Sequence, residues 1–124
     1  MDKESIETLK TKLHQGSLLS ASFLQDLDAE SYLAYRDRAD FDTEWIGAYQ
    51  KLQRDSLTEA EQAQLTEWIR LAFVQVMQQG GDADLAAYVS DDIDMIFTAA
   101  CILEVEDPFI DRLVESYITE HLPV

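Results

Sequence analysis

The stretch from Met95 to Val105 limits the possible folds of this chain more than any other part of the sequence. It is apolar except for one threonine and one glutamate, so on a helix its side chains would point in nearly every direction around the axis. Such a helix is stable in water only where neighbouring helices surround it. With Ser90 as its N-cap, we predict a central helix over about residues 91–105.

Other segments also show helical periodicity, with apolar residues recurring every three or four positions. Thr58 followed by Glu61 matches a capping box, and a regular apolar stripe follows it. No stretch alternates apolar and polar residues as a half-buried strand would. Besides the central helix, we predict helices at about Lys3–Gln15, after a cap at Ser20, after a cap at Asp28, from the Asp40–Thr43 caps to near Asp55, at Glu59–Gln79 with a cap at Gly80-Gly81, and from Pro108 to His121. Asp82 is predicted to cap a short segment before the central helix.

The length and composition fit one folded unit. Hydrophobic residues make up 47% and charged residues 27% of the sequence, so the chain is too apolar to be disordered. Its 124 residues are too few for two domains of ordinary size. The sequence therefore predicts an all-α fold in a single helical domain over residues 1–124. We expect a compact bundle of six or seven helices around the central apolar helix.

The charge of the chain is strongly negative and unevenly distributed. The sequence holds 25 acidic and 9 basic residues, a formal net charge of −16, which argues against direct binding to nucleic acid or to an anionic membrane. Residues 1–54 carry 7 basic and 10 acidic side chains, whereas residues 55–124 carry 2 and 15. The second segment alone therefore has a net charge of −13.

Acidic residues of this second segment are the candidate binding site. We predict that they form an exposed face for a basic protein partner, because complementary charge speeds encounter and sets specificity. Helix capping and solubility are the alternative explanations for these acidic residues. Helix capping does not explain why the same segment has so few basic residues. The predicted partner-binding residues are Asp82, Asp84, Asp91, Asp92, Asp94, Glu104, Glu106 and Asp107.

The sequence gives little support to an enzyme. It contains no phosphate-binding glycine loop, no nucleophile motif and no EF-hand spacing, and His14 and His121 lie outside any helical metal-binding arrangement. We predict a protein with no catalytic residues, no metal and no cofactor. A small metal-dependent enzyme that uses the Asp and Glu clusters stays an alternative.

A second alternative is a helical adaptor or chaperone that binds a peptide in an apolar groove. Aromatic side chains could line such a groove, although aromatics at helical spacing more often lie in the core. The residues concerned are Tyr32, Tyr35, Trp45, Tyr49 and Trp68. Binding in an apolar groove would respond little to salt, whereas binding to an acidic face would weaken steeply as salt rises.

In size, acidity and helix content the chain resembles several immunity proteins and antitoxins, which neutralise basic nuclease toxins by covering the surface meant for nucleic acid. Phage proteins that mimic nucleic acid share these properties. The resemblance implies a basic protein partner, such as a nuclease toxin or another nucleic-acid-binding protein. It assigns no role to any particular residue.

The sequence also predicts where the protein works. Cys101 is the single cysteine, so no internal disulfide can form and a reducing compartment is favoured. No secretion signal is visible at the start of the sequence, and the longest apolar run is far shorter than the ~20 residues that span a bilayer. We predict a cytoplasmic protein and leave its oligomeric state open.

Overall fold

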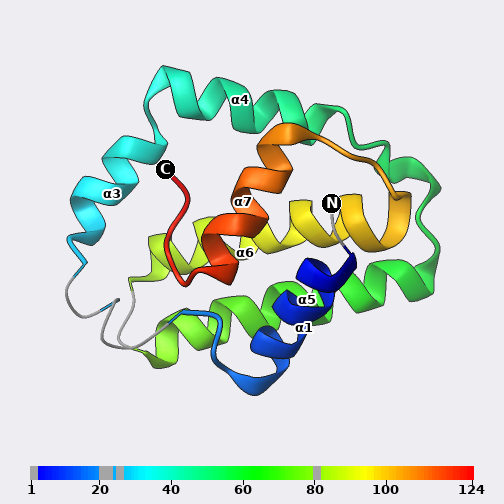
Figure 1. Ribbon diagram of the computed structural model, residues 1–124, viewed down its shortest axis with the longest axis horizontal. Coiled ribbons are helices and arrows are strands. Elements are labelled where there is room, and N and C mark those ends of the chain that lie inside the picture. The colour runs from blue at the N-terminus through cyan, green and yellow to red at the C-terminus, as the bar shows by residue number, and fades with distance from the viewer. Residues whose placement is uncertain (1–2, 20–23, 25–26, 80–81) are drawn as a thin grey trace.

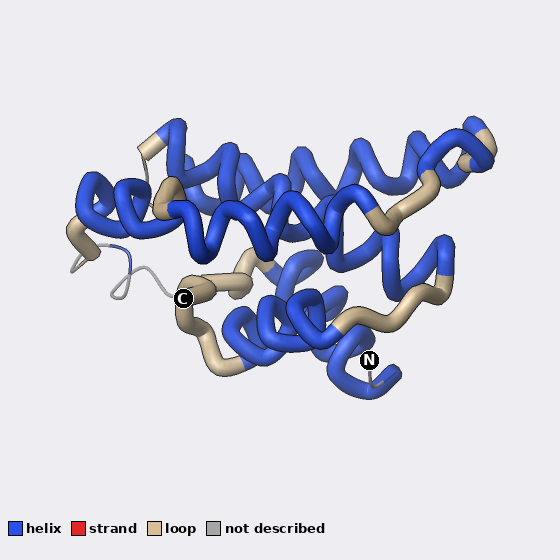
Figure 2. The backbone as a smooth tube through the Cα atoms, turned by 90° about the horizontal axis from the view of Figure 1, so that it is seen from above, coloured by secondary structure: helices blue, strands red, loops and turns tan. Residues whose placement is uncertain are grey.

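The structure, a computed structural model, describes residues 3–19, 24, 27–79 and 82–124. These residues form α-helices joined by short loops, and none of them lies in a strand (Figure 2). The predicted all-α fold is confirmed. The helices are α1 (Lys3–Gln15), α3 (Ala29–Arg36), α4 (Ala39–Gln50), α5 (Glu59–Gln78), α6 (Ala83–Phe97) and α7 (Pro108–Ile118), with a 3₁₀ turn η1 (Arg54–Ser56) and a π-helix η2 (Thr98–Leu103).

Helix α6 and its continuation η2 run through the middle of the molecule (Figure 1). Helix α5 packs along α6, α1 packs on α5 and α7, and α7 also contacts α4 and α6. Helices α3 and α4 lie on the other side of α6 from α5 (Figure 1). The prediction of an apolar segment surrounded by other helices is confirmed for residues 95–99, which are buried, whereas residues 100–103 and 105 are only partly buried and Glu104 is exposed. Helix α6 itself buries nine residues, more than any other helix of the described chain.

The predicted boundaries of the central helix are wrong at both ends. The helix begins at Ala83, because the Asp82 side chain caps it by accepting hydrogen bonds from two backbone N–H groups. Ser90 lies inside the helix, and its hydroxyl donates to the Ala87 carbonyl over 2.9 Å. The α-helical pattern ends at Phe97, and the following residues form η2, which terminates at Glu104 in the left-handed conformation with φ 52°. The predicted 91–105 segment thus covers half of α6 and all of η2.

The capping predictions for three other helices are confirmed. Asp28 caps α3, Thr58 and Glu61 form both hydrogen bonds of the capping box of α5, and Asp107 caps α7 just before Pro108. These caps satisfy backbone N–H groups that have no partner within the helix. Helix α1 also has the predicted bounds.

Other helix boundaries differ from the prediction. Helix α4 begins at Ala39, before the predicted caps, and no side chain caps it. It ends at Gln50, and α7 ends at Ile118. The predicted cap at Ser20 and the glycine cap at Gly80-Gly81 lie outside the described residues. No helix in the described ranges is long and apolar enough to cross a membrane.

Candidate functional site

The uneven charge of the sequence is partly balanced inside the fold. Basic side chains from the first half of the chain reach across to acidic side chains of the second half. Three such pairs have nitrogen to oxygen distances between 2.7 and 2.8 Å, and they join Arg36 to Asp92, Arg54 to Asp94 and Lys51 to Asp107. Three of the eight predicted partner-binding residues therefore bind other parts of the same molecule.

Asp92 is fully buried at the centre of a hydrogen-bond network. Its carboxylate accepts two hydrogen bonds from Arg36, at 2.9 and 2.8 Å, one from the Trp45 indole at 2.8 Å and one from the Tyr117 hydroxyl at 2.6 Å. A buried carboxylate is tolerated only with such compensation. The prediction that Asp92 lies on an exposed acidic face is therefore wrong.

Two partners of Asp92, Arg36 and Tyr117, are buried as well, and Trp45 is partly buried. Burial by itself lowers the pKa of Arg36, but the charge of Asp92 and its hydrogen bonds outweigh burial and hold that pKa above its usual value. Burial raises the pKa of Tyr32 to about 12 and the pKa of Tyr117 well above 10.0. The Tyr32 hydroxyl donates to the Pro123 carbonyl over 2.7 Å, so the network also holds the C-terminal segment.

Asp94 and Asp107 also have internal partners. The Asp94 side chain is 14% exposed and accepts two hydrogen bonds from Arg54, at 3.0 and 2.7 Å. The Asp107 side chain is 4% exposed. Burial would raise the pKa of Asp107, but hydrogen bonds from Lys51 and from the backbone of α7 lower it overall. The predicted placement of these two residues on an open acidic face is wrong as well.

The other five predicted residues are exposed, but they do not form one face. Asp82, Asp84 and Asp91 lie at the start and the middle of α6, whereas Glu104 and Glu106 follow η2. At 1.5 Å per residue, helical structure from position 84 to position 104 spans about 30 Å. Glu104 and Glu106 line a groove that also contains two lysines of α1, Lys3 and Lys10.

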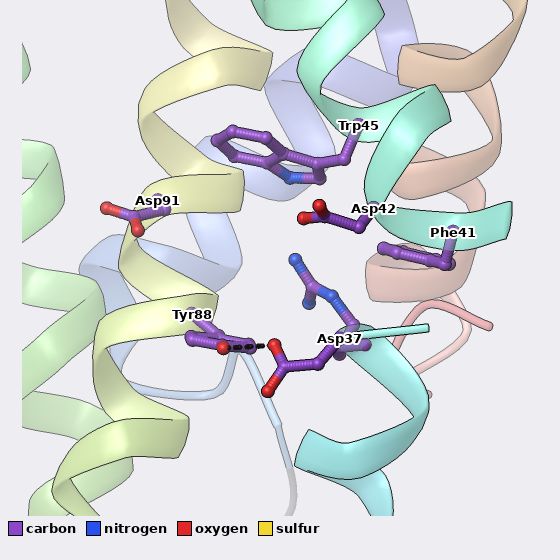
Figure 3. A pocket seen from close by; sticks show the side chains of 7 residues that line it. Asp37, Phe41, Asp42, Trp45, Tyr88 and Asp91 are labelled. Carbon is purple, nitrogen blue, oxygen red and sulfur yellow. Dashed lines mark hydrogen bonds between the residues drawn. The ribbon is translucent and has the colours of Figure 1, made fainter. Parts of the chain in front are cut away.

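A pocket lies where the end of α3 and the first turns of α4 face the middle of α6 (Figure 3). Its volume is about 170 Å³. Phe41, Trp45 and Tyr88 supply aromatic walls, and the Tyr88 hydroxyl donates to Asp37 over 2.5 Å. The lining residues are Arg36, Asp37, Phe41, Asp42, Trp45, Tyr88 and Asp91.

This pocket has an excess of negative charge. Arg36 lines it, but the charge of Arg36 is neutralised by its ion pair with the buried Asp92. Asp37, Asp42 and Asp91 therefore give the site a net charge of −3, from four carboxylates and one guanidinium. Burial, together with the charges of Asp92 and Asp94, raises the pKa of Asp91.

Asp91 is the only predicted partner-binding residue that lines this pocket among the residues the structure describes. Sequence reasoning missed Asp37 and Asp42, which come from the less acidic half of the chain. A usable signal was present, since Asp37, Asp40 and Asp42 fall within six positions beside Phe41 and Trp45. The segment Asp40–Thr43 is predicted only to supply helix caps.

The structure also places the residues on which the two alternative functions depend. No group of three or more His, Cys, Asp or Glu side chains in the described parts of the chain is arranged to hold a metal ion. Of the aromatics proposed to line a peptide groove, Tyr32 and Trp68 are buried, and Trp68 packs against Phe97 with ring centroids 4.6 Å apart.

The class of protein follows from the sequence, which matches a family of immunity proteins. The sequence model of the family described as Immunity protein PIM1 matches residues 8–124. The chain belongs to this family, and membership implies that it binds a partner, typically a toxin. A comparison with curated proteins gave no match.

Proposed function

We propose that this chain neutralises a toxin whose contact surface is positively charged, and that it acts by binding and not by catalysis. The observation that carries this proposal is the pocket between α3, α4 and α6, with its net charge of −3. A toxin that acts on nucleic acid needs a basic surface for its substrate. An acidic protein that covers this surface blocks the substrate and neutralises the toxin.

The distribution of ion pairs supports a cationic partner. Eight basic side chains form ion pairs with acids of the same molecule: Lys10, Lys12, Arg36, Arg38, Lys51, Arg54, Arg70 and Arg112. The chain has 25 acidic and 9 basic residues, a formal net charge of −16, so most carboxylates have no basic side chain to balance their charge. Such a field accelerates association with a basic protein and weakens as salt rises.

The pocket is the best position for the most specific contact. It is concave, its aromatic walls are fixed by packing, and its acids come from separate helices. Interface energy concentrates in such central, preorganised sites. Exposed acids elsewhere, such as Asp84 of α6, would mainly speed the encounter.

The test is a titration of the chain with its toxin by calorimetry at increasing salt. We expect affinity to fall steeply with ionic strength and the Asp42→Lys variant to bind about a hundredfold more weakly than the wild-type chain, because reversal replaces an attraction by a repulsion. Asp55→Lys is the matched control, since Asp55 is an exposed acid outside the pocket. Affinity that is flat in salt, or an equal loss in both variants, would contradict the proposal.

A further inference from the structure

We propose that the pocket between α3, α4 and α6 receives the side chain of one arginine of the toxin. The guanidinium of this arginine would bind the carboxylate of Asp42, beside the indole of Trp45, and Asp91 would add a second negative charge at the same pocket. This inference rests on the proposed function and names the chemical group that the pocket recognises.

The size of the pocket fits one side chain. Sites for drug-sized molecules are about 300–1,000 Å³, whereas this cavity is about 170 Å³. Figure 3 shows that Asp42 extends from α4 toward α6, that Trp45 lies across one end, and that Asp37 and Tyr88 close the other. Asp91 lies on α6, across the pocket from α4, and in this view its carboxylate points away from Asp42 (Figure 3).

The charge of the pocket selects a cation although a cation already lies within it. Arg36 is 6% exposed and gives both terminal nitrogens to Asp92. Its guanidinium also lies over the rings of Phe41 and Tyr88, 4.7 and 5.2 Å from their centroids. Arg36 is therefore part of the wall, and the exposed carboxylates of Asp42 and Asp91 remain accessible to an incoming group.

The arrangement of the carboxylates favours arginine over lysine. Asp42 belongs to α4 and Asp91 to α6, so the acids come from two different walls of the pocket. A planar guanidinium has five N–H donors that can serve acceptors on two sides, and it stacks on aromatic rings. A lysine ammonium is a compact, strongly hydrated charge and gains less from such a site.

The aromatic wall is fixed before any partner binds. The Trp45 indole N–H donates to Asp92 over 2.8 Å, and its ring stacks on Tyr49 with centroids 5.3 Å apart and an angle of 11°. A preorganised site loses little side-chain entropy when it binds, so a single guanidinium can be held without rearrangement.

The experiment follows the two tryptophan indole N–H signals of the full chain by NMR while N-acetyl-arginine amide is added. Trp45 borders the pocket, whereas Trp68 is buried against Phe97 and serves as an internal control. The neutral isostere N-acetyl-citrulline amide and N-acetyl-lysine amide are titrated in parallel. Asp42→Asn and the outside control Asp55→Asn are measured in the same way.

We expect a saturable shift of the Trp45 signal with an apparent Kd of about 1 mM, a range typical of one small anchoring group. The Trp68 signal should stay in place, citrulline should have no effect, and lysine should bind at least about threefold more weakly. Asp42→Asn should weaken arginine binding about tenfold, while Asp55→Asn leaves it unchanged.

Three results would overturn the inference: a Trp45 signal that does not move at concentrations far above the millimolar range, equal shifts with citrulline, or equal affinity for lysine. Failure here is separable from failure of the proposed function. If toxin binding depends on salt but the arginine amide does not bind the pocket, only this inference is wrong. If the toxin does not bind, or binds independently of salt, the proposed function is wrong.

Discussion

Asp91 and Asp92 are neighbours in the sequence, yet they lie in opposite environments. Successive residues of a helix point about 100° apart, so Asp92 faces the core and Asp91 faces the pocket. Asp92 accepts four hydrogen bonds and stabilises the fold, whereas Asp91 keeps a charge that the fold does not use. The comparison shows that an acidic cluster in a sequence can combine structural and binding roles within one turn of helix.

The buried network joins distant parts of the chain. Through Asp92 it connects α3, α4, α6 and α7, and through Tyr32 it reaches Pro123. Such a network stabilises a protein only while every member has its partners. It also fixes the pocket, since Arg36 and Trp45 belong to both the network and the pocket wall.

The strongest test of the comparison replaces each aspartate in turn. We expect Asp92→Asn to lower the free energy of unfolding by about 3–5 kcal/mol, because it leaves the Arg36 charge buried without a counter-charge. Urea denaturation measures the change. Tyr117→Phe removes only one hydrogen bond to Asp92 and should lower the free energy of unfolding by about 1–2 kcal/mol. This milder variant tests the network if Asp92→Asn does not fold. Equal effects of Asp92→Asn and Asp91→Asn would refute the distinction between the two residues.

The network should also make the protein sensitive to alkali. The pKa of Tyr32 is raised from 10.0 to about 12, so the folded state keeps a proton that the unfolded chain loses above pH 10. Stability is therefore fully present below pH 10 and falls as pH rises toward 12, by about 3 kcal/mol for this group. Denaturation followed from pH 8 to 12 measures this loss. A stability that stays constant across that range would contradict the burial of the tyrosine hydroxyls.

Two helix caps extend the comparison of buried and exposed acids. Asp107 caps α7 while buried against Lys51, and Asp82 caps α6 while exposed. We expect Asp107→Ala to cost about 2 kcal/mol and Asp82→Ala about 1 kcal/mol or less, because the first also loses a hydrogen bond to a charged group. Thermal denaturation of both variants gives the difference. The stability that the Asp107 carboxylate contributes should also be lost in acid. It is fully present above pH 3.8 and decreases as the pH falls through the lowered pKa of Asp107. A larger loss at Asp82 would mean that burial adds nothing to the cap.

The smallest expected effect has the opposite sign. The pKa of Asp91 is raised by burial and by the charges of Asp92 and Asp94, so ionising this carboxyl costs more free energy in the folded state than in the unfolded chain. Asp91→Asn should raise the free energy of unfolding, by no more than about 0.5 kcal/mol because the side chain is exposed and screened by solvent. The same variant should bind the toxin more weakly. A loss of stability would show that the Asp91 charge serves the fold.

The sequence was sufficient to predict the helices and several of their ends. Thr58, Asp28 and Asp107 are caps with local partners, so their roles depend on only a few neighbouring residues. The sequence did not predict that α6 continues through Ser90, because a serine can either cap a helix or lie within one. The tertiary contacts around the serine determine which of the two occurs. The π-helix after Phe97 has no sequence signal that we recognise.

The pocket could be predicted only in part. Asp91 was among the predicted residues, but Asp37 and Asp42 meet it only through the packing of α3 and α4 against α6. The pairing of Arg36 with Asp92 spans 56 positions, and no local pattern gives such a contact. A regional excess of one charge therefore did not distinguish an exposed acidic face from acids that pair with cations of the other half.

The most direct test of the central claim compares two double variants of equal charge in their affinity for the toxin. Asp42→Asn/Asp91→Asn changes the pocket, and Asp55→Asn/Glu115→Gln changes exposed acids outside it, so each has a net charge of −14, from −16 plus 2. We predict that the pocket variant binds about a hundredfold more weakly than the outside variant. Equal affinities for the two variants would show that the toxin responds to total charge, and that the pocket is not its binding site.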